Sequence, residues 1–175
     1  MALKIEKLSK RYDNKWALRD VELDVTEGEI FGIFGGTASG KTTLFELITG
    51  LNQPTSGTVR VHGQAIHQVK RSQSGQLARH YHQSYQVRAF RRSKPDFLLA
   101  RAAGDYPLVH LFDEPQFNTQ DGYIGFMLDF FRRLRDDGRL VFVCLHPNEP
   151  VHLEILAEVC SQFIFVHKDA SGVSR

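Results

Sequence analysis

The chain has few cysteines, little net charge and no long apolar run. Its two cysteines, Cys144 and Cys160, lie in apolar stretches without CxxC spacing, which predicts two reduced, buried thiols. A net charge of +2 over 175 residues is too small to indicate nucleic-acid binding, so no nucleic acid is expected as a partner. No apolar run approaches the roughly 20 residues of a membrane-spanning helix, and the first residues lack a signal-peptide core. These absences predict a cytoplasmic protein that would reach a membrane only through a partner.

Hydrophobic residues (42%) and charged residues (24%) occur in ordinary globular proportions, so residues 1–175 are expected to form a single domain. Early in the chain, residues 3–8 and 21–25 alternate between apolar and polar, as strands with one wet face do. Residues 29–35 are more continuously apolar and predict a strand buried on both faces. Residues 41–51 then predict a helix with Leu44, Leu47, Ile48 and Leu51 on one face.

Between residues 69 and 96 the sequence is polar and basic, and no periodicity stands out. Beyond it, helices are predicted at 97–103, 123–137 and 151–159, and strands at 107–114, 139–146 and 162–167. Strands that alternate with helices predict an α/β fold with a mainly parallel sheet flanked by helices. The early alternating strands add an N-terminal antiparallel β portion.

A glycine-rich stretch follows the buried strand and opens the first helix. Residues 35–42 fit G-x-x-x-x-G-K-[ST], the pattern of a P-loop. Glycines let the backbone turn its N–H groups toward a β-phosphate, and the N-terminus of the helix adds partial positive charge. Lys41 is expected to reach the β- and γ-phosphates, and Thr42 to offer its hydroxyl to Mg²⁺. The predicted nucleotide-binding residues here are Gly35, Gly36, Thr37, Ala38, Ser39, Gly40, Lys41, Thr42 and Thr43.

Two acidic residues, Asp113 and Glu114, end an apolar strand later in the chain. An acid in this place can hold Mg²⁺, and a second acid beside it can polarise an attacking water. The sequence has no N-K-x-D motif for guanine, which argues against a GTPase. These features predict a P-loop NTPase core that binds a nucleotide with Mg²⁺; the family resemblance below implies that the nucleotide is ATP.

Taken together, these motifs resemble the nucleotide-binding domain of ABC-type ATPases, as found in ABC transporters. The likeness runs through residues 8–63, 97–115 and 140–169, in the order of the family. The resemblance implies that Tyr12 stacks on adenine and that His146 contacts the γ-phosphate. It further implies that Gln83 contacts Mg²⁺ and the attacking water, with Gln86 as a rival for that role.

The chain departs from the family where a signature similar to LSGGQ is expected, because no Ser-Gly-Gly precedes residues 100–102. The sequence SQSGQ at 72–76 lies before Gln83 instead of after it and is interpreted as a polar loop. Only 30 positions separate Gln83 from Asp113 (113 − 83), less than half of what the family has. The helical subdomain is therefore predicted to be reduced or absent around residues 84–96. After the acidic pair, Asp121 is a weak match to an aspartate that contacts the other subunit of a dimer.

Two functions remain open at this point. The first is an ATPase with Glu114 as general base, weak alone, paired with a second ABC-type subunit that supplies a signature. The second is a regulatory or assembly module that binds ATP with little turnover, because the signature is absent. A basic cluster at Arg88, Arg91, Arg92 and Lys94 is interpreted as a solvated remnant of the missing subdomain or a contact for an acidic partner.

Overall fold

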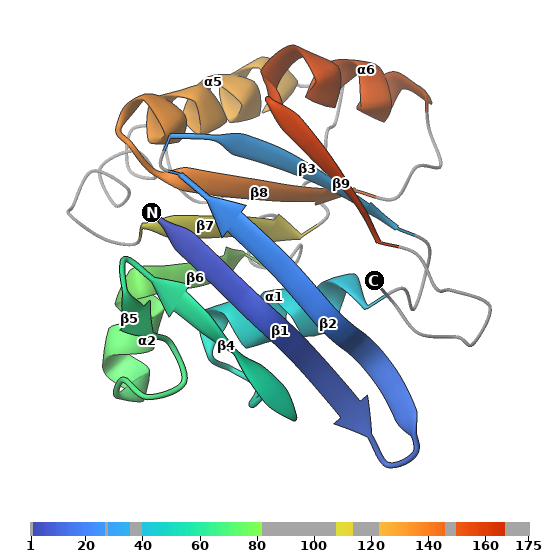
Figure 1. The fold of residues 1–175 in the computed structure, drawn as a ribbon. Helices are drawn as coiled ribbons and strands as arrows, with labels where there is room; N and C mark the ends of the chain where they lie inside the picture. Colours follow the sequence, from blue (N-terminus) through green and yellow to red (C-terminus); the bar gives the residue numbers. More distant parts are fainter. Residues whose placement is uncertain are drawn as a thin grey trace.

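The computed structural model describes residues 2–26, 28–35, 40–81, 108–113, 123–145 and 150–166. Within these ranges the strands form one four-stranded and one five-stranded sheet (Figure 1). The predictions for 84–96 and for a helix at 97–103 lie outside the described residues.

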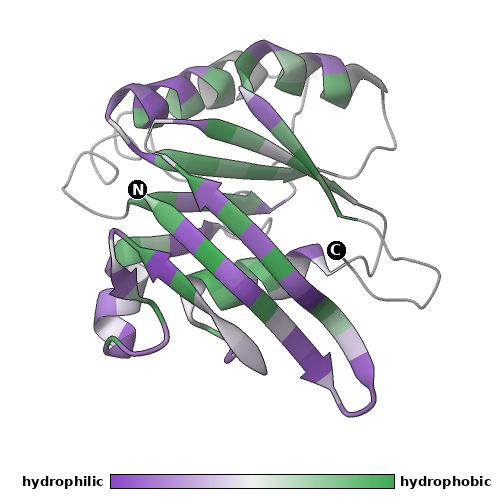
Figure 2. Cartoon of the chain, in the orientation of Figure 1, coloured by the Kyte–Doolittle hydropathy of each residue, from purple (hydrophilic) through white to green (hydrophobic). Residues whose placement is uncertain are grey.

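The four-stranded sheet is antiparallel and comes from the first part of the chain. It contains β1 (Leu3–Tyr12), β2 (Lys15–Val25), β4 (Ser56–Val61) and β5 (Gln64–Ala65) in the order β2-β1-β4-β5. Figure 2 shows hydrophilic and hydrophobic residues alternating along β1 and β2, as expected for a sheet with one solvated face. The predicted antiparallel portion is confirmed, with strands longer than the alternating segments.

The five-stranded sheet is parallel throughout its described pairings. It contains β6 (Ala78–Tyr81), β7 (Val109–Asp113), β8 (Leu140–Leu145), β3 (Ile30–Gly35) and β9 (Gln162–Val166), in the order β6-β7-β8-β3-β9. Each of its four strand pairs is parallel. The predicted α/β class with a mainly parallel sheet is confirmed.

Helices cover both faces of this parallel sheet. Helices α5 (Tyr123–Asp136) and α6 (Pro150–Val159) lie together on one face, and α1 (Lys41–Thr49) lies on the other, facing the antiparallel sheet (Figure 1). The short α2 (Arg71–Leu77) packs beside α1. The result is a layered arrangement in which the parallel sheet is buried on both sides.

Side chains of β3 point alternately to the two faces of the parallel sheet and so enter two separate hydrophobic cores. Phe31 and Ile33 join the core that α1 and the antiparallel sheet share, which also contains Phe45. Ile30 and Phe34 point the other way, into the core beneath α5 and α6. Because both faces are covered, β3 reads as a continuous apolar run, as its sequence predicts.

One expectation within residues 69–96 was wrong. Residues 72–76 are part of α2 and not a polar loop, and β6, a strand that the sequence did not predict, follows directly. Leu77 is the one large apolar residue of α2, and with Ser74 it is buried, so the helix has too few apolar positions to show a period. The Ser74 hydroxyl donates to the Arg71 carbonyl oxygen within the helix.

Leu51 and Cys160 also depart from expectation. Helix α1 stops at Gly50, so Leu51 lies beyond it, 54% exposed, and Phe45 joins the buried face instead. Both cysteines are free thiols, as predicted, but only Cys144 is fully buried and Cys160 is partly exposed.

Candidate functional site

The glycine-rich motif connects β3 to α1 at the carboxyl end of the parallel sheet. Gly35 is the last residue of β3 and pairs with Val166 of β9. Gly40 precedes α1, whose first residues are Lys41, Thr42 and Thr43. Residues 36–39, which carry Gly36, Thr37, Ala38 and Ser39, lie outside the described residues. The strand, motif and helix therefore follow one another in the order that a P-loop requires.

Electrostatics at the start of α1 favour an anion. The first turn of α1 contains no acidic residue, so none of its own side chains opposes the partial positive charge of the helix N-terminus. Lys41 is only 7% exposed, which is unusual for a lysine, whereas the neighbouring Thr42 is exposed. A buried ammonium group at a helix N-terminus can contact a bound phosphate as a point charge.

The strand register places Asp113 near this motif. Asp113 ends β7 and pairs with Cys144 of β8, and Cys144 pairs in turn with Ile33 of β3. The Asp113 backbone is thus two strands from Ile33, about 10 Å at the usual spacing of neighbouring strands. In parallel sheets, ligands bind outside the carboxyl ends of the strands, which is where Asp113 and Gly35 both lie.

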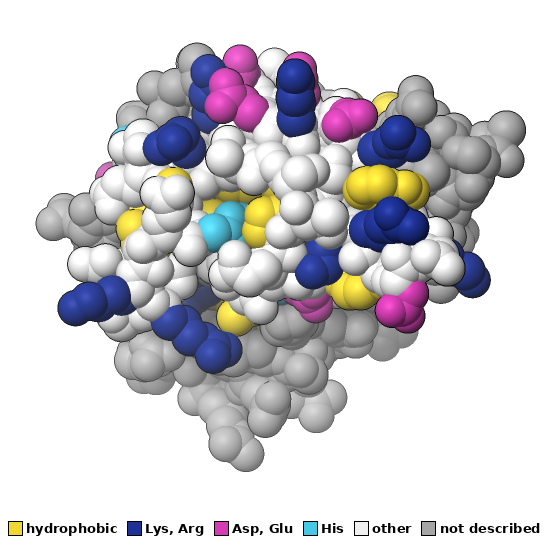
Figure 3. All heavy atoms as spheres, turned by 60° about the horizontal axis from the view of Figure 1, so that its bottom comes forward, with side chains coloured by type: hydrophobic (Ala, Val, Ile, Leu, Met, Phe, Trp, Pro, Cys, Tyr) yellow, Lys and Arg dark blue, Asp and Glu magenta, His cyan; other side chains and the backbone are white. Residues whose placement is uncertain are grey.

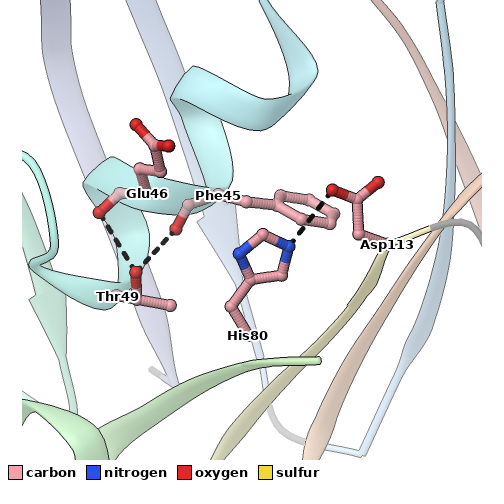
Figure 4. A network of polar contacts seen from close by, with 5 residues as sticks. All are labelled: Phe45, Glu46, Thr49, His80 and Asp113. Carbon is pink, nitrogen blue, oxygen red and sulfur yellow. Dashed lines mark hydrogen bonds and ion pairs between the residues drawn. The ribbon is translucent and has the colours of Figure 1, made fainter. Parts of the chain in front are cut away.

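A histidine that the sequence did not single out touches Asp113. His80, on the neighbouring strand β6, has its Nε2 atom 3.2 Å from Asp113 Oδ2 (Figure 4). Its ring also meets the Phe45 ring edge to face, with the centroids 5.3 Å apart. No sequence signal marked this residue, because the strand that carries it was not predicted.

Tyr12 lies at the end of β1 with 47% of its surface exposed. Asn52 donates from Nδ2 to the Tyr12 hydroxyl at 2.7 Å and to Glu46 Oε2 of α1 at 3.2 Å. The Lys10 ammonium group lies 5.1 Å from the centroid of the Tyr12 ring. An exposed ring held at its hydroxyl end can stack on a flat ligand.

A second polar chain is buried on the other face of β6 and β7. Tyr81 Oη lies 2.9 Å from His110 Nδ1, and Arg139 Nη1 lies 3.5 Å from His110 Nε2. His110 is 0% exposed and Arg139 is 4% exposed, and Asp137 pairs with Arg139 at 3.1 Å. The polar residue in the otherwise apolar strand at 109–112 was the signal available for this network.

Several predicted site residues lie outside the described residues: Gln83, Gln86, Glu114, Asp121 and His146. Their roles remain predictions. The basic cluster at 88–94 lies outside as well.

Three other kinds of site were considered among the described residues: a surface patch of one charge sign, a metal site formed by protein side chains alone, and a membrane-spanning helix. Seen from below the view of Figure 1, the basic and acidic side chains of the described residues lie interspersed on this face (Figure 3). Among the described residues, no three His, Cys, Asp or Glu side chains are grouped to hold a metal by themselves. The helices in the described part of the chain are all too short or too polar to span a bilayer.

Comparison with known proteins gives a consistent result. A sequence profile described as "ABC transporter" matches residues 18–96. The methionine import ATP-binding protein MetN 2 of Bacillus licheniformis is 44% identical over 72 residues, which cover 39% of this chain and 21% of that protein. The sulfate/thiosulfate import ATP-binding protein CysA of Pectobacterium atrosepticum is 35% identical over 83 residues, 46% of this chain and 25% of that protein. The matches thus span about a quarter or less of these relatives.

Solved structures extend the likeness over nearly the whole chain. A nucleotide-free ATP-binding cassette from an ABC transporter superposes with a TM-score of 0.72 at 16% identity, covering 94% of this chain and 87% of that one. The ATP-binding subunit of another ABC transporter gives 0.70 at 19% identity, with 94% and 85% coverage.

The fold and the strand–motif–helix arrangement define a P-loop NTPase core of the α/β class. Within that class, the sequence profile over residues 18–96 and the aligned relatives resemble the nucleotide-binding domains of ABC transporters, and the solved structures share the fold. The resemblance predicted from the sequence is thereby confirmed.

Proposed function

We propose that the chain binds Mg²⁺ and ATP at the carboxyl edge of its parallel sheet and hydrolyses ATP to ADP and phosphate. The proposal rests on the register of the parallel sheet. Asp113 of β7 pairs with Cys144 of β8, which pairs with Ile33 of β3, the strand that leads into the P-loop motif. Lys41 at the start of α1 supplies the cation on the same edge.

Binding of the nucleotide would be divided between the P-loop motif and Tyr12. Backbone amides of residues 35–40 and the N-terminus of α1 would surround the phosphates, and Lys41 would neutralise the β- and γ-phosphates. Tyr12, held at its hydroxyl by Asn52, would stack on adenine.

The described oxygen donors fit Mg²⁺. This ion prefers carboxylate, hydroxyl and phosphate oxygens and commonly takes only one or two carboxylates from the protein. Asp113, whose side chain is 18% exposed, and the exposed Thr42 would provide such oxygens, with Gln83 as a further contact. Bound Mg²⁺ would offset the negative charge that gathers on the β- and γ-phosphates during transfer.

For the chemical step, Glu114 would accept a proton from the attacking water, and Gln83 would orient that water. His146 would contact the γ-phosphate and stabilise its charge, as would Lys41. Apart from the proton transfer to Glu114, these groups would act by position and charge, which is how phosphoryl transfer is mainly catalysed.

The missing signature favours a second candidate, an ATP-binding regulatory or assembly module with little turnover. Losing one preorganised charge-stabilising group commonly costs on the order of 10²–10³ in rate. Under the first candidate, a second ABC-type subunit would supply the signature. Because relatives are named as import ATP-binding proteins, the chain would act in the cytoplasm and reach the inner membrane face only through a partner.

Equilibrium dialysis with labelled ATP tests binding first. Lys41→Ala should weaken binding about 10- to 100-fold, as expected for one charge-assisted contact. Lys70→Ala, an exposed lysine just before α2, is the matched control and should leave binding unchanged. Absence of saturable ATP binding by the unmodified chain would rule out both candidates.

Phosphate release then separates the two candidates. If the chain is an ATPase, Glu114→Gln should lower turnover by about 10²–10⁴-fold, the range for a general base. Turnover that is absent, or equal in the variant, would leave the binding module, and the assay should be repeated with an ABC-type partner subunit.

A further inference from the structure

His80 is buried between the two elements that the proposed function uses. Its side chain is 1% exposed, and it contacts both Asp113 and the α1 residue Phe45 (Figure 4). The strand register explains the first contact: His80 pairs with Leu111, and Asp113 is two residues further along β7, on the same face.

The contact fixes how the Asp113 carboxylate is turned. An ionised carboxylate can only accept hydrogen bonds, so with Asp113 ionised the His80 Nε2–H group would be the donor to Asp113 Oδ2 across the 3.2 Å contact. A carboxylate held through one oxygen cannot rotate freely about its last torsion. The second oxygen is thereby given a defined direction.

Phe45 restricts the histidine ring in turn. The Phe45 side chain is 0% exposed and meets the His80 ring at an interplanar angle of 87°. Phe45 is four residues after Lys41, so both lie on one face of α1, one turn apart. His80 therefore links the helix that carries Lys41 and Thr42 to the strand that carries Asp113.

We propose that His80 is a positioning residue: it orients the Asp113 carboxylate toward the magnesium-bound phosphates and so couples ATP binding to Mg²⁺. This inference rests on the proposed function, because it assigns Asp113 a role at Mg²⁺. Partners of metal ligands commonly change metal affinity 10- to 100-fold when they are replaced, without touching the metal.

The test uses the full chain and two readouts: the dissociation constant for a fluorescent ATP analogue in EDTA, and the half-saturating Mg²⁺ concentration at fixed nucleotide. His80→Phe keeps a ring against Phe45 and removes the donor, whereas His80→Gln keeps an N–H near the position of Nε2. We expect His80→Phe to raise the Mg²⁺ midpoint about 10-fold. The constant in EDTA should change by less than about 2-fold, and His80→Gln should restore most of the Mg²⁺ response.

A purely structural role predicts another pattern. Nucleotide binding with and without Mg²⁺ would then fall together, and His80→Gln would be as defective as His80→Phe. Either that result or an unchanged Mg²⁺ midpoint in folded His80→Phe overturns the proposal. If His80→Phe does not fold, His80→Asn replaces it, because its shorter amide does not reach Asp113; equal Mg²⁺ midpoints for Asn and Gln then refute the role.

Asp113→Asn provides the second check. In that background His80→Phe should have no further effect on the Mg²⁺ midpoint, since the carboxylate it orients is gone; additive effects contradict the proposal. Failure here is distinct from failure of the proposed function. If the unmodified chain binds no ATP, the function is wrong; if it binds ATP with Mg²⁺ and the His80 variants match it, only this inference is wrong.

Discussion

Replacing Gly57 by alanine should destabilise the fold far more than the same change at Gly63. Both glycines have left-handed backbone conformations, with φ of 87° and 79°, so alanine costs each about 1–2 kcal/mol in strain. They differ in their surroundings. A methyl group on Gly63 meets nothing within 4 Å, whereas one on Gly57 would lie 2.6 Å from Leu8 Cα and closer still to the Lys7 carbonyl group.

The additional cost at Gly57 follows from what must move. β1 is irregular opposite Gly57, between the pairs Glu6↔Thr58 and Ser9↔Ser56, and it approaches β4 there backbone to backbone. Separating the strands by about 1 Å would strain the 2.8 Å bond that Thr55 N donates to Ser9 O, and each such bond contributes about 1 kcal/mol. Adding strain, this bond and the loss of packing around Leu8 gives roughly 3–5 kcal/mol for Gly57→Ala.

Urea unfolding measures both variants. The single tryptophan, Trp16, lies on β2 and reports on the antiparallel sheet, and far-UV circular dichroism reports on the whole chain. The slope of the unfolding free energy against urea concentration should be the same for both variants, so that the difference in their urea midpoints measures the difference in stability. If Gly57→Ala and Gly63→Ala unfold within about 1 kcal/mol of each other, the close approach of β1 and β4 is not what the structure indicates.

Three further predictions concern the core, pH and the thiols. Phe131→Ala, at 0% exposure, should cost about 3–5 kcal/mol in urea unfolding, and Phe165→Ala, at 67%, less than about 1. Burial lowers the pKa of His67 below 6.5, so the unfolded chain binds more protons and stability falls as pH drops through about 6.5. His67→Gln should reduce the dependence of the free energy of unfolding on pH between about pH 5 and 7; an unchanged pH dependence contradicts this. Burial raises the pKa of the Cys160 thiol to about 12, so mass spectrometry should find it barely alkylated at pH 8 unless the chain is unfolded.

The sequence predicted well those parts of the fold that apolar residues specify. The run at 30–35 is apolar on both faces, and the structure places it between two cores. The antiparallel strands alternate in sequence because one face is solvated (Figure 2). In these elements the spacing of apolar residues follows directly from which side chains are buried, so the sequence pattern predicts the burial.

Prediction failed where few apolar residues mark an element. Helix α2 has Leu77 as its one large buried apolar side chain, and strand β6 is only four residues long. Strands as short as β6 give no readable period, and their position depends on a partner strand distant in sequence. The same limit applies to the candidate site. The spacing of neighbouring residues predicted the P-loop motif, but it could not predict the contact between His80 and Asp113, which are 33 positions apart and meet only through the strand register.

Strand β6 shows what replaces apolar packing at this edge of the parallel sheet. Its last two side chains point to opposite faces, and each contacts a polar residue of β7: His80 reaches Asp113, and Tyr81 reaches His110. A shift of register by one residue would exchange the faces and break both contacts, so the two pairs specify the alignment of β6 and β7. Because the pairs lie on opposite faces, one toward α1 and the other toward Phe112 and α5, the chain can keep the alignment through Tyr81 while His80 is varied. The positioning role of His80 is therefore separable, by mutation, from the structural role of the strand that carries it.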